Sequence, residues 1–98
     1  MTREELENKI ELLEGVADSL SGLARLKANT EINLIKNELA VRGVEDISNL
    51  MTSISLPELA DMDSKILAAS DATKTQEERI GYLNTAVGFI KNALGVAL

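Results

Sequence analysis

Residues 80–98, IGYLNTAVGFIKNALGVAL, carry the clearest helical pattern of the chain. Apolar residues recur there at helical spacing in stripes that each repeat after seven residues and together cover about 160° of a helix at 100° per residue. A helix with so wide an apolar surface is mostly buried. The stripes are Ile80, Val87 and Leu94; Leu83, Ile90 and Ala97; and Tyr82, Phe89 and Val96, with Ala86 and Ala93 between them.

The remaining narrow face of this helix contains Gly81, Gly88 and Gly95, spaced seven residues apart. Each glycine costs a solvated helix about 1 kcal/mol relative to alanine, which favours a compensating contact. We predict that the glycines let a second helix backbone approach closely, as small residues do in membrane helices. The predicted interface residues are Gly81, Tyr82, Asn84, Gly88, Phe89, Asn92 and Gly95.

Two other interpretations of the glycines remain open. Glycines can occur on an exposed face by chance, and an apolar helix can lie on a membrane surface. Interfacial helices usually carry several basic residues, whereas Lys91 is the only one between residues 80 and 98. A membrane role is therefore the less favoured of the two.

The N-terminal segment predicts an amphipathic helix over residues 3–28. Thr2 and Glu5 have the spacing of a capping box, and Gly15 and Gly22 repeat the seven-residue interval. The apolar positions at steps of three and four are Leu6, Ile10, Leu13, Val16, Ala17, Leu20, Leu23 and Ala24.

Beyond Asn29 the apolar stripe turns by roughly 100° around the helix axis. This stripe consists of Ile32, Leu34, Ile35, Leu39 and Val41. Either the helix breaks near Asn29 and a second helix covers residues 31–42, or one long helix contacts different neighbours along its length. Gly43 is placed to end this segment as a C-terminal cap.

The rest of the chain predicts three further helices. A short one covers residues 45–54, and Ser55, Pro57 and Glu58 have the capping pattern that begins another over residues 57–70. Its expected buried side is Leu59, Met62, Ile66 and Leu67. Thr75 with Glu78 begins the last helix, over residues 75–97. Since no β alternation appears, we predict an all-α single domain, residues 1–98, with four or five helices.

Composition favours an oligomer. The 98 residues are 45% hydrophobic but only 2% aromatic, so the core must be built from Leu, Ile, Val and Ala. A chain of this size buries only roughly 60 to 70% of its unfolded surface, which leaves stability marginal. With no cysteine to form a disulfide, association is the most accessible further source of stability.

The residue types argue against an enzyme. The chain has neither histidine nor cysteine, the commonest general base and a common nucleophile. Glu58, Asp61 and Asp63 are its densest carboxylate group, but acidic residues favour the first turns of a helix, and calcium needs a curved loop. We therefore predict no catalytic residue, cofactor or metal.

The step Asp63-Ser64 invites comparison with acyl carrier proteins, small acidic helical proteins whose serine carries a phosphopantetheine arm. In those proteins a glycine-containing loop precedes the serine, which begins a helix and is followed by a hydrophobic residue. Here Lys65 follows, and the cap at Ser55 places Ser64 inside a helix. The sequence therefore argues against a carrier protein.

Charge further restricts the partners. The net charge is −6, and the ten basic residues are not clustered, so nucleic acid is not an expected partner. No run of about 18 apolar residues predicts a membrane span. The first residues are charged and lack the apolar core of a signal peptide, so a cytoplasmic location is expected.

Two functions follow from these patterns. In the first, the protein is a non-enzymatic subunit that associates with itself through the C-terminal helix, in a symmetric oligomer or a repeating assembly such as a phage or secretion component. In the second, it is a small adaptor, inhibitor or chaperone whose apolar surface receives a helix of a host or client protein.

Overall fold

The protein is an all-α bundle, as predicted. A computed structural model describes residues 3–42 and 56–94, which form helices α1 (Arg3–Ser19), α2 (Gly22–Val41), α4 (Leu56–Ser70) and α5 (Gln76–Leu94), with no strand in those ranges. The predicted helix over residues 45–54 lies outside the described residues. So do the predicted caps at Thr2, Gly43 and Ser55, and residues 95–98.

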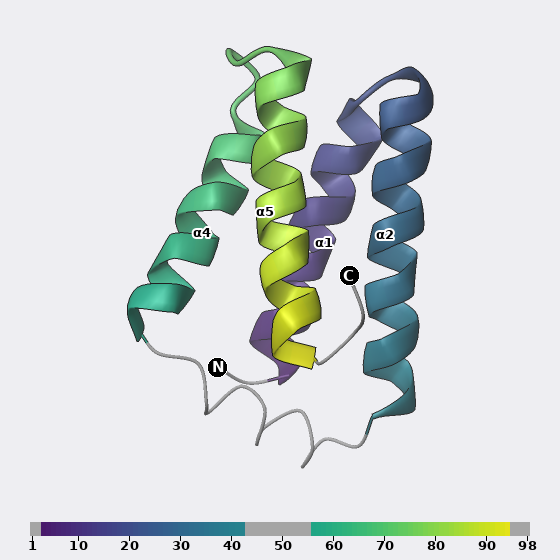
Figure 1. Ribbon diagram of the computed structural model, residues 1–98, viewed down its shortest axis with the longest axis vertical. Helices are drawn as coiled ribbons and strands as arrows, with labels where there is room; N and C mark the ends of the chain where they lie inside the picture. The colour runs from purple at the N-terminus through teal and green to yellow at the C-terminus, as the bar shows by residue number, and fades with distance from the viewer. Residues whose placement is uncertain (1–2, 43–55, 95–98) are drawn as a thin grey trace.

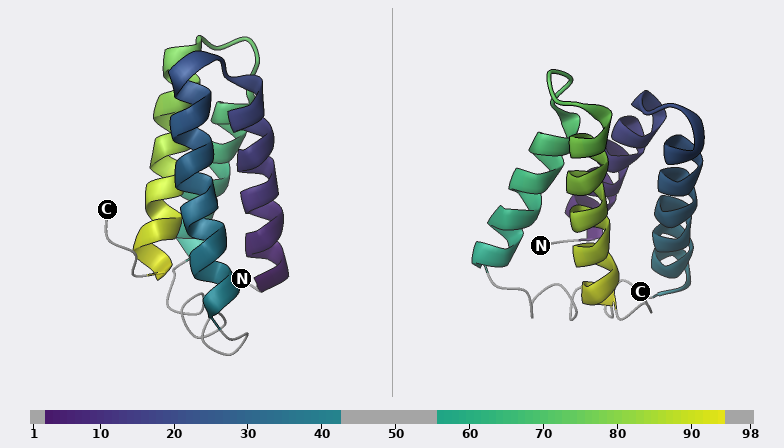
Figure 2. Two further views of the ribbon diagram at one scale, coloured as in Figure 1. Left: turned by 90° about the vertical axis from the view of Figure 1, so that its right-hand side faces the viewer. Right: turned by 45° about the horizontal axis from the view of Figure 1, so that its top comes forward.

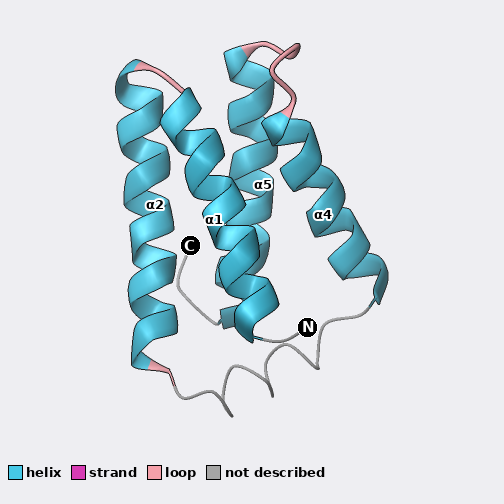
Figure 3. Ribbon diagram, turned by 180° about the vertical axis from the view of Figure 1, so that it is seen from behind, coloured by secondary structure: helices cyan, strands magenta, loops and turns pink. Residues whose placement is uncertain are grey.

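The helices run alternately up and down (Figure 1). Successive helices are antiparallel, and α1 packs beside α4 while α2 packs beside α5. The further views in Figure 2 show the same four-cornered arrangement, with α2 and α4 at opposite corners. Seen from behind, α1 lies in front of α5 and between α2 and α4 (Figure 3).

The core consists of aliphatic side chains from all four helices. Leu13, Ile35, Leu83 and Ile90 are among the fully buried residues, and burying one such side chain contributes about 1.5–3 kcal/mol. Tyr82 and Phe89 are half-buried and pack against this core from its margin. The expected core of Leu, Ile, Val and Ala is confirmed for the described residues, with Met62 of α4 as a further fully buried side chain.

The break between α1 and α2 falls at Leu20 and Ser21, so the predicted helix over residues 3–28 and the break near Asn29 are wrong. Gly22 has φ of +66°, a conformation that glycine adopts at little cost, and the chain reverses there. Leu20 is buried in the core, and the Ser21 amide and hydroxyl both donate to Gln76 Oε1. Tertiary contacts therefore fix the turn.

The later helix boundaries agree closely with prediction. Helix α4 ends at Ser70 as expected, and α5 begins directly after Thr75. The Glu78 amide donates to Thr75 Oγ1 at 3.2 Å, which satisfies one of the free amides at the start of α5. The predicted capping role of Thr75 is confirmed.

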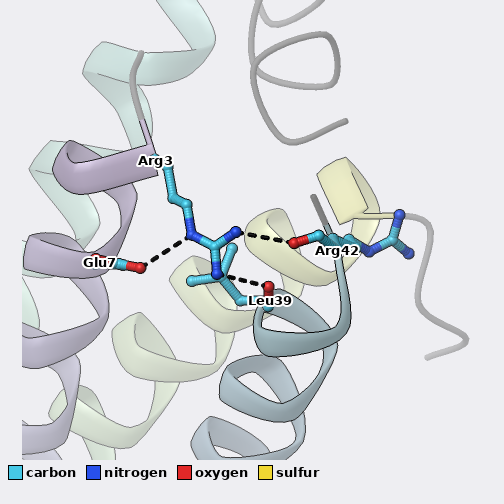
Figure 4. Close-up of polar contacts among 4 residues, drawn as sticks. All are labelled: Arg3, Glu7, Leu39 and Arg42. Atoms are coloured by element: carbon cyan, nitrogen blue, oxygen red, sulfur yellow. Dashed lines mark hydrogen bonds and ion pairs between the residues drawn. The ribbon is translucent and has the colours of Figure 1, made fainter. Parts of the chain in front are cut away.

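Arginines from other helices cap the carbonyl ends of three helices. The Arg3 guanidinium donates to Leu39 O at 3.0 Å and to Arg42 O at 2.9 Å, and also bonds Glu7 (Figure 4). Arg42 in turn donates to Leu94 O at the end of α5. Arg79 donates to Ala69 O near the end of α4. Because α2 and α4 have no basic residue in their last turns, their caps come from elsewhere in the chain.

Ion pairs join three pairs of neighbouring helices. Lys9 of α1 bonds Asp63 of α4, Glu14 of α1 bonds Lys36 of α2 at 2.5 Å, and Glu31 of α2 bonds Lys91 of α5. The hydrogen bond and charge of Glu14 raise the pKa of Lys36. Exposed pairs contribute little stability, so the main effect of the Lys9–Asp63 and Glu14–Lys36 pairs is to favour one alignment of the helices.

Candidate functional site

Helix α2 is apolar on two faces. Its inner face contributes Ala28, Ile32, Ile35 and Leu39 to the core. On the other side, Leu23, Leu26, Leu34 and Val41 are exposed by 73%, 64%, 39% and 79%. Among the described residues, the remaining large apolar side chains with comparable exposure are Leu12 and Leu67, each on a different helix. Exposed apolar surface is therefore concentrated on α2.

The exposed residues of α2 form one stripe. At 100° per residue, Leu23, Leu26, Leu34 and Val41 fall within an arc of about 80°, and Thr30 and Asn37 fall inside the same arc. We call these six residues the outer stripe of α2. The Thr30 hydroxyl donates to Leu26 O at 2.8 Å, so its hydrogen-bonding need is met within the helix. The stripe thus presents a largely apolar face with one amide, that of Asn37.

An open groove adjoins the upper part of the stripe. It lies between α2 and α5 and has a volume of about 880 Å³. Leu23 and Leu26 line its α2 side, and Ile80 and Val87 line its α5 side. We call it the α2–α5 groove; its lining also includes Leu83, Asn84, Gly88, Lys27, Thr30, Glu31 and Lys91.

The predicted interface residues divide between two sides of α5. Gly81, Asn84 and Asn92 are exposed and Gly88 is half-buried, and Asn84 and Gly88 line the α2–α5 groove. Tyr82 and Phe89 instead pack against the core, and Gly95 lies outside the described residues.

Tyr82 has its own partners. Lys65 of α4 and Lys74 of the following loop each place an ammonium 5.7 Å from the centre of the Tyr82 ring. Cation–π contacts at this distance hold the ring against α4. Tyr82 therefore belongs to the α4–α5 contact rather than to the glycine face.

The described glycines inside α1 and α5 do not serve close packing among the described residues. A Cβ atom built on Gly15, Gly81 or Gly88 would meet nothing within 4 Å. Gly15 and Gly22 also belong to different helices, so their seven-residue interval does not place them on one helix edge. None of the described helices approaches closely at Gly81 or Gly88.

Two other side chains have burial unusual for their residue type. Lys91, the charged residue near the end of α5, is only 7% exposed, because its ammonium reaches Glu31 across the contact between α2 and α5. Leu67 was expected in the core but is 72% exposed, and Ala69 is buried instead. The other expected residues of this side agree with prediction, since Met62 and Ile66 are buried and Leu59 packs against the core.

The outer stripe was missed because of the helix break. Leu23 was assigned to the buried stripe of the first helix, whereas Leu34 and Val41 were grouped with the inner face of the second. The spacing of residues 23, 26, 30, 34, 37 and 41 becomes visible as one stripe only when the helix is known to begin at Gly22. The spacing of these residues was present in the sequence, but the residue at which the helix begins was not evident from it.

Asp71 has a lowered pKa because the Thr73 hydroxyl and amide donate to its carboxylate, but it is part of a loop turn. Within the described ranges, no group of three or more acidic side chains is placed to hold a metal ion. The smaller groove between α1 and α2, about 320 Å³, is lined mainly by charged side chains such as Glu7, Glu11 and Lys36.

Fold and surface together define a class: an antiparallel four-helix arrangement, within the described residues, that exposes an apolar stripe on one helix. None of the described helices combines the length and apolar character needed to cross a membrane. Comparison with protein-family models, with curated proteins and with solved structures gave no match.

Proposed function

We propose that this protein is a non-enzymatic subunit that associates with a second copy of itself through the outer stripe of α2. The observation that carries this proposal is that α2 is apolar on two opposite faces, only one of which the bundle covers. An exposed helix face with several large apolar side chains is typical of a surface that contacts another molecule. A second copy is the simplest molecule that would cover the exposed face.

The energetics allow association. In a two-fold interface the same four apolar residues are buried on both copies, and full burial of a completely exposed side chain of this kind contributes about 1.5–3 kcal/mol. Because the four side chains are 39% to 79% exposed in the single chain, complete coverage on both copies contributes roughly 8–15 kcal/mol. The loss of translational and rotational freedom costs an estimated 4–15 kcal/mol, so association requires close coverage of the stripe.

The exposed face of α5 extends the same surface. Gly81, Asn84, Gly88 and Asn92 lie beside the α2–α5 groove or on the adjoining outer side of α5. Since a Cβ at Gly81 or Gly88 has open space around it, a helix backbone from outside the chain can approach there closely. The predicted role of these glycines in association is therefore retained as part of the proposal.

The α2–α5 groove favours a second candidate function. Its apolar walls, open length and rim of Lys27 and Asn84 suit an amphipathic helix from a client protein. In that case the isolated protein is a monomer, and the groove binds a helix of another protein.

Absolute mass by light scattering, measured over a hundredfold range of concentration, tests the proposal. We expect a mass of at least two chains, and we expect Leu26→Gln to lower it to one chain while circular dichroism shows unchanged helicity. Leu67→Gln is the matched control, because Leu67 is equally exposed but lies on α4. A monomer at every concentration would reject self-association and leave the client-binding function.

A further inference from the structure

We infer that two copies pair antiparallel along α2, with their outer stripes in contact and a two-fold axis passing near residue 32. This inference rests on the proposed self-association and adds its geometry. It commits to a second copy as the occupant of the stripe.

The first argument is the spacing of the stripe. Residues 23, 26, 30, 34, 37 and 41 follow one another at steps of three, four, four, three and four, so the order is almost the same from either end. Antiparallel pairing about residue 32 then places Leu23 opposite Val41 of the partner subunit, and Thr30 opposite Leu34 of the partner subunit. Leu26 lies opposite Asn37 of the partner subunit. An antiparallel pair therefore brings all six positions into contact at once.

The second argument is charge. On the α5 side of the stripe lie Lys27, Glu31 and Glu38, whereas Asn29, Asn33 and Ala40 flank it on the other side, with Lys36 further round the helix, where it bonds Glu14 of α1. A two-fold axis perpendicular to α2 brings the charged sides of both copies together. Lys27 of each copy then lies opposite Glu38 of the partner subunit, so the interface gains two oppositely charged pairs.

The side chains in question are available for these pairs. Lys27 is exposed, and none of the described residues forms an ion pair with it. The Glu38 side chain is 37% exposed and lies 3.6 Å from Arg42, which leaves part of the carboxylate accessible.

A parallel pair is the competing geometry. It would place each residue of the stripe opposite the same residue of the partner subunit. A buried Asn pairs with its equivalent in this way in many parallel coiled coils. However, the charged side of each α2 would then face the other flank of its partner, and Lys27 would have no acidic residue opposite it. The charge distribution therefore favours the antiparallel pair.

Exchanging the charges of Lys27 and Glu38 tests the antiparallel geometry directly. Lys27→Glu and Glu38→Lys should each raise the dissociation constant of the homodimer at least fivefold, because like charges then face each other twice. An equimolar mixture of the two variants should form a heterodimer at least as tight as the unaltered dimer. Asp61→Lys on α4 is the control, since it changes the charge by the same amount away from α2. Circular dichroism confirms that each variant is folded.

Disulfide trapping gives an independent readout, because the chain contains no cysteine. In the antiparallel pair, the two copies of residue 37 lie roughly 15 Å apart along the helix axis, at 1.5 Å per residue. The two copies of residue 26 lie about 18 Å apart. Asn37→Cys and Leu26→Cys should therefore cross-link in a mixture and not separately.

The outcomes separate this inference from the proposed function. A dimer in which each cysteine variant cross-links with itself would overturn the antiparallel geometry but retain self-association. A dimer without any cross-link would place the interface on another face and overturn the inference. A monomer at every concentration would reject both.

Discussion

Gly22 and Gly15 are the same residue type in two different conformations. Gly22 has φ of +66° at the turn into α2, whereas Gly15 is inside α1 with open space around the position of a Cβ. We expect Gly22→Ala to lower the free energy of unfolding by about 1 kcal/mol, because alanine is strained at positive φ. Gly15→Ala should raise it by about 0.5–1 kcal/mol through helix propensity. Urea unfolding measures both, and equal effects of the same sign would contradict the assigned turn.

The pair formed by Lys91 and Glu31 is the second residue-scale feature. The Lys91 side chain is 9% exposed, and Glu31, at 43%, is the acidic residue that bonds its ammonium. Glu31→Gln should lower the free energy of unfolding by about 1–3 kcal/mol, because a buried charge then loses its ionic partner. Combining it with Lys91→Met should recover most of that loss. A double variant less stable than Glu31→Gln alone would show that the pair itself is needed.

Helix α2 shows how one element can serve two surfaces. Ile35 on the inner face is fully buried, while its neighbour Leu34 is 39% exposed on the outer stripe. Measured on the dilute monomer, Ile35→Ala should cost about 2–5 kcal/mol of unfolding free energy, because it leaves a cavity. Leu34→Gln should change it by no more than about 0.5 kcal/mol. Chemical denaturation of each variant distinguishes the faces, and a large loss from Leu34→Gln would mean that the bundle itself covers this residue.

At the scale of the whole molecule, association should be visible as stability. A dimer that forms only between folded chains stabilises them by mass action, so the midpoint of thermal unfolding depends on concentration. For a domain of this size, we expect Tm to rise roughly 5–10 °C over a hundredfold increase in concentration. Differential scanning calorimetry measures it, with Leu26→Gln as the variant whose Tm should stay constant. A constant Tm in the unaltered protein would argue against association in this range.

The contacts of the capping arginines also depend on the whole molecule. Arg3 and Arg42 bond carbonyls at helix ends far away in the sequence, and Arg79 bonds Ala69 O near the end of the preceding helix. The spacing of these arginines in the sequence does not indicate which carbonyls they bond, because every helix end has free backbone carbonyls. Only the packing of the bundle brings a given guanidinium to a given end.

By itself, the sequence determined the helical class, the aliphatic core and the start of α5 at Thr75, because helical periodicity and capping are local properties. The tertiary structure decided where α1 ends, that Leu67 of α4 is exposed and that Lys91 is buried. It also decided that the exposed apolar surface lies mainly on α2 rather than on the glycine face of α5. Those outcomes depend on which neighbour each helix meets. A pattern with apolar residues on two sides cannot say which side the bundle will cover.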